Sequence, residues 1–140
     1  MALLVVRHAR AGKRKAWQGD DRQRPLDRRG WRQAEGLPGL LASYAVERIV
    51  SSGYLRCVQT VEPLAQARGL SVETRPEAEE AASREEALGL LVELGDRAAV
   101  STHGDVLERL FGVDGQKGST RVVELRDGEP VVLAYLPPPA

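Results

Sequence analysis

The sequence predicts an α/β fold with three αβα layers, in which helices cover both faces of a mostly parallel sheet and the chain closes with a hairpin. Two patterns support this prediction. Short apolar runs alternate with helical segments four times along the chain, and two runs of alternating character follow them. The 140 residues contain no repeat, no low-complexity stretch and no dividing linker. We therefore expect a single domain over residues 1–140.

The N-terminal third begins with the run ALLVV at residues 2–6, which predicts a strand that is buried on both faces. Residues 9–29 are rich in Arg, Lys, Asp and Gly, contain Pro25, and predict a long loop. A loop of this length in a compact domain is usually functional. Residues 27–44 place apolar side chains at helical spacing and predict a helix, which Pro38 is expected to kink.

The middle of the chain predicts two further strand–helix pairs. Residues 47–52 predict a second strand, and residues 53–69 predict a helix that ends on its final glycine. Residues 70–75 alternate like a third strand. The next helix should begin after Ser83, because Glu86 stands three residues later and the pair can form a capping box.

The C-terminal part adds the last parallel strand and the closing hairpin. Residues 97–102 predict a fourth buried strand, and residues 104–112 predict a short helix. Residues 120–136 contain two alternating runs joined at Asp127 and Gly128, a dipeptide that is typical of a tight hairpin turn.

The composition, with 42% hydrophobic and 29% charged residues, is that of an ordinary soluble globular protein. A single cysteine excludes an internal disulfide and favours a cytoplasmic location. No apolar run approaches the roughly 20 residues that span a bilayer, so we expect no membrane partner. The opening MALLVV lacks the basic region and the length of a signal peptide.

The net charge is zero but unevenly spread. Residues 7–32 contain ten Lys or Arg against three Asp. Such a basic segment favours an anionic ligand, although a solvated basic loop would explain the charge equally well. Arg10, Lys13 and Arg14 in the loop 10–24 could contact a phosphate or a polyphosphate tail, or simply lie on the surface. A nucleic-acid partner is disfavoured, because Asp residues interrupt the segment and aromatic residues are few.

Polar side chains follow three of the predicted strands directly. In an open α/β sheet, ligands bind beyond the carboxyl ends of the strands, so these side chains should share one site. Both histidines of the chain occupy such positions, where the alternative is that each is a satisfied, partly buried polar residue. The residues at these positions are Arg7 and His8 after the first strand, Ser51, Ser52 and Arg56 after the second, and His103, Gly104 and Asp105 after the fourth.

Two imidazoles with two or three arginines favour phosphoryl transfer. Guanidinium groups bind phosphoryl oxygens in a fork and stay charged at any working pH, and a neutral imidazole is a competent nucleophile. A second histidine, when protonated, could donate to the phosphoryl oxygens. No HExxH, CxxC or GxxxxGK[ST] motif is present, so no metal site or P-loop is expected. Cys57 is followed six positions later by Pro63 rather than by the arginine of a cysteine phosphatase.

Three segments resemble the blocks of the histidine phosphatase superfamily, which includes the phosphoglycerate mutases. They are VVRHARAG, in which Ala9 replaces the usual glycine, IVSSGYLRCVQTVEPLA at residues 49–65, and AVSTHGDVL at residues 99–107. The blocks follow the family order and spacing over most of the chain. The chain particularly resembles the small phosphohistidine phosphatases and the short domains fused to Nudix hydrolases in actinobacterial MutT-like proteins, although it contains no Nudix box.

The resemblance implies a role for each matched position. His8 would be the nucleophile that becomes phosphohistidine, Arg7 and Arg56 would clamp the phosphoryl oxygens, and His103 would be the second histidine of the pocket. The backbone N–H of Gly104 could donate at a helix N-terminus. A general acid is expected within RPEAEEAAS, and we favour Glu79 over Glu80 and Glu77. That acidic cluster could instead be a solvated loop, since an imidazole leaving group needs little help.

The combined prediction is a phosphatase that works without metal or cofactor through a covalent phosphohistidine. The short chain predicts an open, shallow site, suited to a phosphorylated protein or a nucleotide better than to a small sugar, and disfavours a mutase. Trp17 and Trp31 could stack on a base, although Trp31 has the helical phase of a core residue. The alternative function is a module that binds a phosphate or nucleotide without turning it over.

Overall fold

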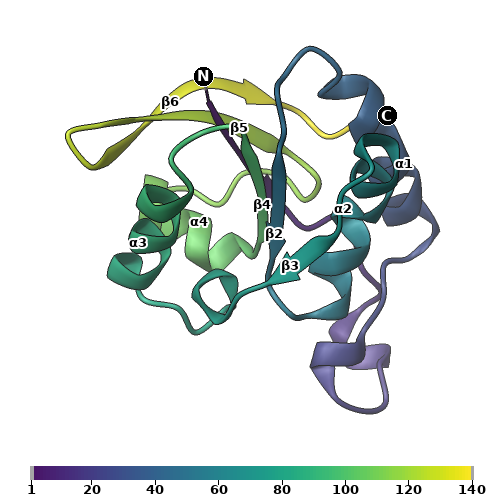
Figure 1. Cartoon of the computed structure of the whole chain (residues 1–140). Helices are drawn as coiled ribbons and strands as arrows, with labels where there is room; N and C mark the ends of the chain where they lie inside the picture. The colour runs from purple at the N-terminus through teal and green to yellow at the C-terminus, as the bar shows by residue number, and fades with distance from the viewer. Residues whose placement is uncertain (1, 140) are drawn as a thin grey trace.

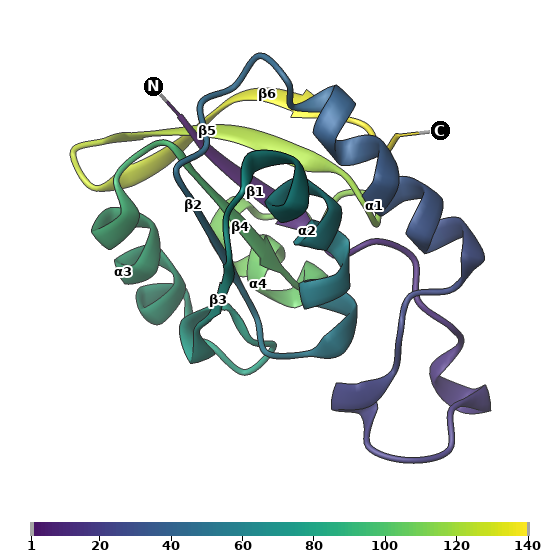
Figure 2. The same cartoon turned by 45° about the vertical axis from the view of Figure 1, so that its right-hand side comes forward.

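The computed structural model describes residues 2–139, which form one six-stranded sheet between two pairs of helices (Figures 1 and 2). The strands lie in the order β3-β2-β4-β1-β5-β6. Their bounds are β1 Leu3–Arg7, β2 Arg48–Ser51, β3 Val72–Thr74, β4 Ala98–Thr102, β5 Thr120–Arg126 and β6 Glu129–Leu136. The helices are α1 Arg28–Leu40, α2 Leu55–Arg68, α3 Arg84–Leu94 and α4 Gly104–Phe111.

The sheet is parallel over its first four strands. β4 pairs in parallel with both β1 and β2, and β2 pairs in parallel with β3. β5 runs antiparallel to β1 and pairs with β6 in the predicted hairpin. Asp127 and Gly128 both have positive φ, at 53° and 76°, as a two-residue hairpin turn requires. The predicted fold class, a mostly parallel sheet with a closing hairpin, is confirmed.

Two hydrophobic cores separate the layers, because successive side chains of a strand point to opposite faces. Leu3 and Val5 of β1 pack with side chains of α3 and α4. Leu4 and Val6 pack with side chains of α1 and α2 on the other face. The fully apolar run at residues 3–6 thus supplies both cores, which explains why it shows no alternation.

Short-range signals begin and end the helices. Asp27, which is not among the caps predicted above, caps α1 by accepting a hydrogen bond from the Gly30 N–H. Gly69 ends α2 in the left-handed conformation, with φ 66°. Ser83 and Glu86 form the complete capping box of α3. The bounds differ by a few residues from the predicted ones, chiefly in α1, which ends at Leu40 rather than at residue 44, and in β3, which is shorter than residues 70–75.

The loop between β1 and α1 contains two short 3-10 turns, Arg14–Ala16 and Asp21–Gln23. It projects from the body of the domain beside the carboxyl ends of the strands (Figure 2). Its two arms are joined by an antiparallel bridge between Ala11 and Leu26. Within residues 2–139, no helix has both the length and the apolar character needed to cross a membrane.

Candidate active site

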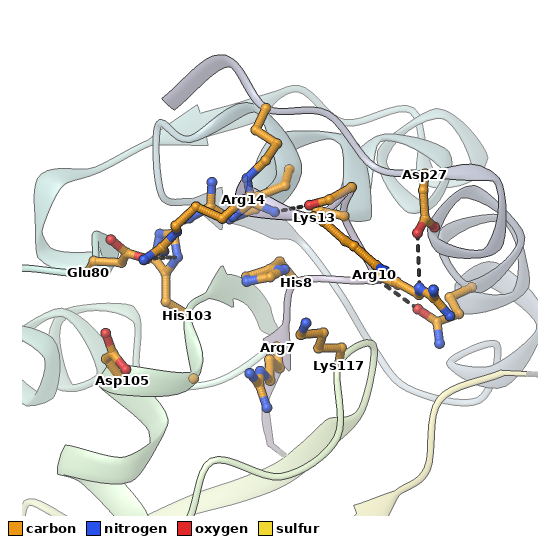
Figure 3. A pocket seen from close by; sticks show the side chains of 16 residues that line it. Arg7, His8, Arg10, Lys13, Arg14, Asp27, Glu80, His103, Asp105 and Lys117 are labelled. Atoms are coloured by element: carbon orange, nitrogen blue, oxygen red, sulfur yellow. Dashed lines mark hydrogen bonds and ion pairs between the residues drawn. The ribbon is translucent and has the colours of Figure 1, made fainter. Parts of the chain in front are cut away.

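A cavity of about 710 Å³ opens at the carboxyl ends of β1 and β4, beside the N-terminal turns of α2 and α4 (Figure 3). Five of the predicted site residues line it together, although almost a hundred positions separate the first from the last. They are Arg7, His8, Arg56, His103 and Gly104. Parallel strands end at the same edge of a sheet, so their following residues converge there.

His8 is held at the floor of this cavity by the backbone on both sides. Its N–H donates to the Thr102 carbonyl at 2.9 Å, and its own carbonyl accepts from the Gly118 N–H at 3.1 Å. Its Nδ1 lies 2.8 Å from the Ala9 carbonyl. A carbonyl only accepts, so Nδ1 carries the proton and Nε2 keeps the lone pair.

The charge state of His8 suits a nucleophile. The side chain is buried, and this burial, together with the nearby Arg56 and Arg7, lowers its pKa to about 3. A neutral imidazole needs no deprotonation before it attacks an electrophile. The same surroundings that bind an anion therefore keep the Nε2 lone pair available.

His103 faces His8, with ring centroids 5.5 Å apart and ring planes at 69° (Figure 3). Its Nε2 is 2.9 Å from the Ser52 hydroxyl, and its Nδ1 is 3.6 Å from a carboxylate oxygen of Glu80. Burial, His8 and Arg56 lower the pKa of His103 to about 2. The second histidine, which could donate to phosphoryl oxygens when protonated, is therefore neutral in the free site.

The guanidinium groups of Arg7 and Arg56 are held by acidic partners, but within residues 2–139 each keeps one N–H donor without an acceptor. Arg56 is 1% exposed, and its terminal nitrogens donate to the Asp21 carbonyl and carboxylate and to Glu80, at 3.0–3.1 Å. Arg7 is paired with Asp114 at 3.3 Å. Among the described residues, the Nε–H of each arginine is buried without a hydrogen-bond partner. Buried donors are almost always satisfied, so the two unpaired Nε atoms suit a ligand that supplies acceptor oxygens.

Gly104 allows the close approach of Arg7 to the first turn of α4. A Cβ atom at this position would lie 2.9 Å from the guanidinium carbon of Arg7. Any side chain at position 104 would displace Arg7. This steric conflict explains why a glycine follows His103.

The three candidate acids have different surroundings. Glu77 pairs with Arg75 at 2.6 Å, and Glu79 forms a two-pronged pair with Arg22 at 2.8 and 3.1 Å. Neither of these glutamates lines the cavity, whereas Glu80 does. The structure therefore does not bring the favoured Glu79 to the site. The chain turns at this point so that adjacent carboxylates face different arginines.

Glu80 contacts the central residues of the cavity. Its carboxylate lies 3.1 Å from Arg56, 3.5 Å from Arg14 and 3.6 Å from His103. Of the three candidate glutamates, Glu80 is the one that lines the same cavity as His8 (Figure 3). Within residues 2–139, no group of three or more His, Cys, Asp or Glu side chains is placed to hold a metal ion.

The family model for the histidine phosphatase superfamily (branch 1) matches residues 3–90, which include His8, Arg7 and Arg56. The chain belongs to the histidine phosphatase superfamily. The match ends before β4, so His103 is assigned to the site by its position in the structure. The more specific likeness to Nudix-fused domains stays a prediction.

Known relatives of this histidine phosphatase fold differ in length and in name. The chain is 37% identical to the 8-oxo-(d)GTP phosphatase of Mycolicibacterium smegmatis over 98% of its own length, and it spans 48% of that relative. The fold is shared with the protein histidine phosphatase SixA solved with tungstate (TM-score 0.82, 21% identity, 99% of this chain and 97% of SixA). It is also shared with a putative SixA from Agrobacterium tumefaciens (TM-score 0.79, 24% identity, 98% of each chain).

Sequence reasoning missed Lys117, which lies on the cavity rim beside His8 (Figure 3). The N–H of the next residue, Gly118, donates to the carbonyls of both Arg7 and His8 at 3.1 Å. These bonds hold the loop before β5 against the end of β1. Partial desolvation of the ammonium, with Arg7 and Arg24 nearby, lowers the pKa of Lys117. No motif or periodicity marks this lysine, so only the tertiary fold reveals it.

The basic loop 10–24 contributes both to the cavity wall and to ion pairs within the fold. Arg10, Lys13, Arg14 and Arg24 line the cavity. Three of these cations also form ion pairs that shape the loop: Arg10 with Asp27 at 2.9 Å, Arg24 with Asp21 at 2.9 Å, and Arg14 with Glu80 at 3.5 Å. The loop therefore adds positive potential to the site and is fixed by its own acidic residues.

Proposed function

We propose that this histidine phosphatase hydrolyses a phosphoric monoester or phosphoramidate, without metal, through a covalent phosphohistidine on His8. The observation that carries the proposal is the convergence of a neutral imidazole, a second imidazole and two arginines with unpaired Nε–H donors in one cavity. The guanidinium groups supply the positive charge that phosphoryl oxygens require.

In the first step, the lone pair of His8 Nε2 attacks phosphorus and forms the N–P bond, while the bond from phosphorus to the leaving group breaks in line. Arg7 and Arg56 hold the phosphoryl oxygens. Binding of this anion raises the proton affinity of His103, which then donates to an oxygen. Glu80, which lines the cavity and takes up a proton from solvent when the substrate binds, delivers that proton to the departing oxygen or nitrogen.

In the second step, a water molecule attacks the phosphohistidine, with Glu80 accepting the proton of that water. The N–P bond breaks, inorganic phosphate leaves, and neutral His8 is restored. The sum of the two steps is hydrolysis of one phosphate bond, with no net change in the enzyme. The names of the relatives support two substrate types, a phosphorylated nucleotide and a phosphohistidine protein.

The alternative is a module that binds phosphate without turnover. The lowered pKa of His8 argues against it, because a pocket made only to hold an anion gains from a cationic histidine. Burial at this position instead maintains the neutral ring.

Rapid quenching of the enzyme with ³²P-labelled acetyl phosphate tests the proposal. We expect a protein-bound label that is stable in alkali and lost in acid, as a phosphoramidate is, and no such label in His8→Ala. The matched control is Leu133→Ala on the exposed surface of β6, which should label like the wild type. A wild-type enzyme that binds phosphate but neither labels nor releases phosphate would support the binding module.

A further inference from the structure

A second cavity, of about 240 Å³, adjoins the phosphate cavity on the side of the projecting loop. The two cavities share Gly12, Lys13, Arg24 and Asp27 in their linings. The remaining wall of the second cavity is apolar and consists of Ala16, Trp17, Pro25 and Leu26. A charged cavity that shares four lining residues with a partly apolar, tryptophan-lined one suits a ligand that carries an apolar ring on a phosphate chain.

Trp17 is the large side chain of this wall. It is 37% exposed, and its indole N–H donates to the Asp20 carbonyl at 2.9 Å. The polar edge of the ring is therefore satisfied within the loop, which restrains the indole and leaves an accessible aromatic surface. Exposed tryptophans that are held in this way offer a stacking surface at low entropic cost.

The opposite wall is held firmly. Leu26 is buried against Ala9, Ala34 and Trp31, and its N–H donates to the side-chain oxygen of Gln59 at 2.9 Å. The guanidinium of Arg24 donates to the Gly12 carbonyl and so joins the two arms of the loop. The second cavity is thus an ordered part of the fold.

The cations of the site outnumber those that one phosphoryl group needs. Arg7 and Arg56 suffice to clamp the transferred group, whereas Arg10, Lys13 and Lys117 line the same cavity in addition. A chain of two or more phosphates would use these further charges, and Lys13 continues them into the second cavity. A phosphohistidine peptide carries a single phosphoryl group and would use fewer of these cations.

We propose that the second cavity is a base-binding subsite, in which the ring of a nucleoside di- or triphosphate stacks on Trp17 while its terminal phosphoryl group meets His8. This inference rests on the proposed phosphatase function and specifies its substrate. The loop 12–27 then selects the substrate, and the strand ends perform the chemistry.

Guanosine 5′-diphosphate and inorganic pyrophosphate form a matched pair of probes, because they share the two phosphates and differ by the nucleoside. In the His8→Ala background, calorimetry should show tighter binding of the diphosphate nucleotide. Adding Trp17→Ala should weaken nucleotide binding by about tenfold, the usual size of one base–aromatic stack, and change pyrophosphate binding little. Trp17→Phe keeps an aromatic ring and should retain most of the affinity.

Turnover by the otherwise wild-type chain gives an independent measurement. Trp17→Ala should lower kcat/KM for the nucleotide relative to ring-free acetyl phosphate, and Leu133→Ala should leave this ratio unchanged. Absence of nucleotide binding, or an equal loss for nucleotide and pyrophosphate, would overturn the subsite. So would a Trp17→Ala effect confined to a phosphohistidine peptide. Acetyl phosphate turnover that requires His8 would still stand, so failure of the subsite and failure of the phosphatase function are distinguishable.

Discussion

The imidazole of His8 meets that of His103 edge to face, with centroids 5.5 Å apart, in a site that also contains Arg7 and Arg56. Protonation of either ring would place a positive charge next to the positive charges of Arg7 and Arg56. The lowered pKa values of both histidines follow from this arrangement and from burial. The site therefore holds its positive charge on arginine and keeps His8, the proposed nucleophile, neutral.

The first prediction concerns the titration of these rings. Both should remain neutral well below the ordinary histidine pKa of 6.5, because burial opposes the charged form. NMR of the imidazole C–H signals between pH 7.5 and about 5 should show no titration in the ligand-free protein. The variant His103→Asn assigns the two signals. A midpoint near 6.5 for either ring would contradict the prediction.

Stability should fall as the solution becomes moderately acidic. The pKa of each of these histidines is lower in the folded chain than in the unfolded chain. Between these two pKa values the unfolded chain binds a proton that the folded chain does not, so lowering the pH through this range stabilises the unfolded state. For His8 this window runs from 6.5 down to about 3. Urea unfolding between pH 6.5 and 5 should show a loss of ~1 kcal/mol per pH unit for each histidine. The slope should be smaller in His8→Asn, and an unchanged slope would be evidence against this account.

Gly104→Ala should impair catalysis with little effect on folding. The added methyl group would meet the Arg7 guanidinium carbon at 2.9 Å and push the clamp away from its position. Misplacement on this scale costs about 10- to 100-fold in kcat/KM. Gly89→Ala on α3 is the matched control, because a Cβ there meets nothing within 4 Å. Full activity in Gly104→Ala would remove the steric explanation for the glycine.

Lys117→Ala should weaken substrate binding more than it slows chemistry. The ammonium lies beside His8 on the cavity rim, where it would attract the phosphate chain of the proposed substrate. Loss of a charged hydrogen bond predicts a rise in KM of roughly tenfold, with a small change in kcat. Lys15→Ala removes an equal charge from the same side of the molecule outside both cavities. Equal effects of the two variants would mean that only net charge matters.

Glu80→Gln and Glu79→Gln should separate the two adjacent carboxylates. Glu80 lies 3.1 Å from Arg56 inside the cavity, whereas Glu79 pairs with Arg22. For an alkyl phosphate, whose leaving group needs a proton, Glu80→Gln should lower kcat by about 100-fold or more. With p-nitrophenyl phosphate, which needs less assistance, the loss should be smaller. If Glu79→Gln gave the larger loss, the acid would be Glu79 after all.

Much of this site could be predicted from the sequence because its residues belong to local patterns. His8 and His103 directly follow buried strands, and parallel strands bring such positions to one edge. The helix caps at Ser83 and Gly69 are likewise encoded within a few residues of each other. The sequence could not distinguish Glu79 from Glu80 in this way, because the two adjacent glutamates lie in the same local pattern. They differ only in the arginines that they contact in the folded chain.

The sequence by itself determined the order of strands and helices, the hairpin turn and the two histidines of the site, because periodicity, capping and turn chemistry act over short distances. Only the tertiary structure decided which carboxylate enters the cavity, that Lys117 joins the rim, and that the loop around Trp17 forms a second cavity. These features depend on contacts between segments far apart in the chain, such as the bonds of Gly118 to the end of β1. Such contacts are set by packing, which leaves no periodic trace in the sequence.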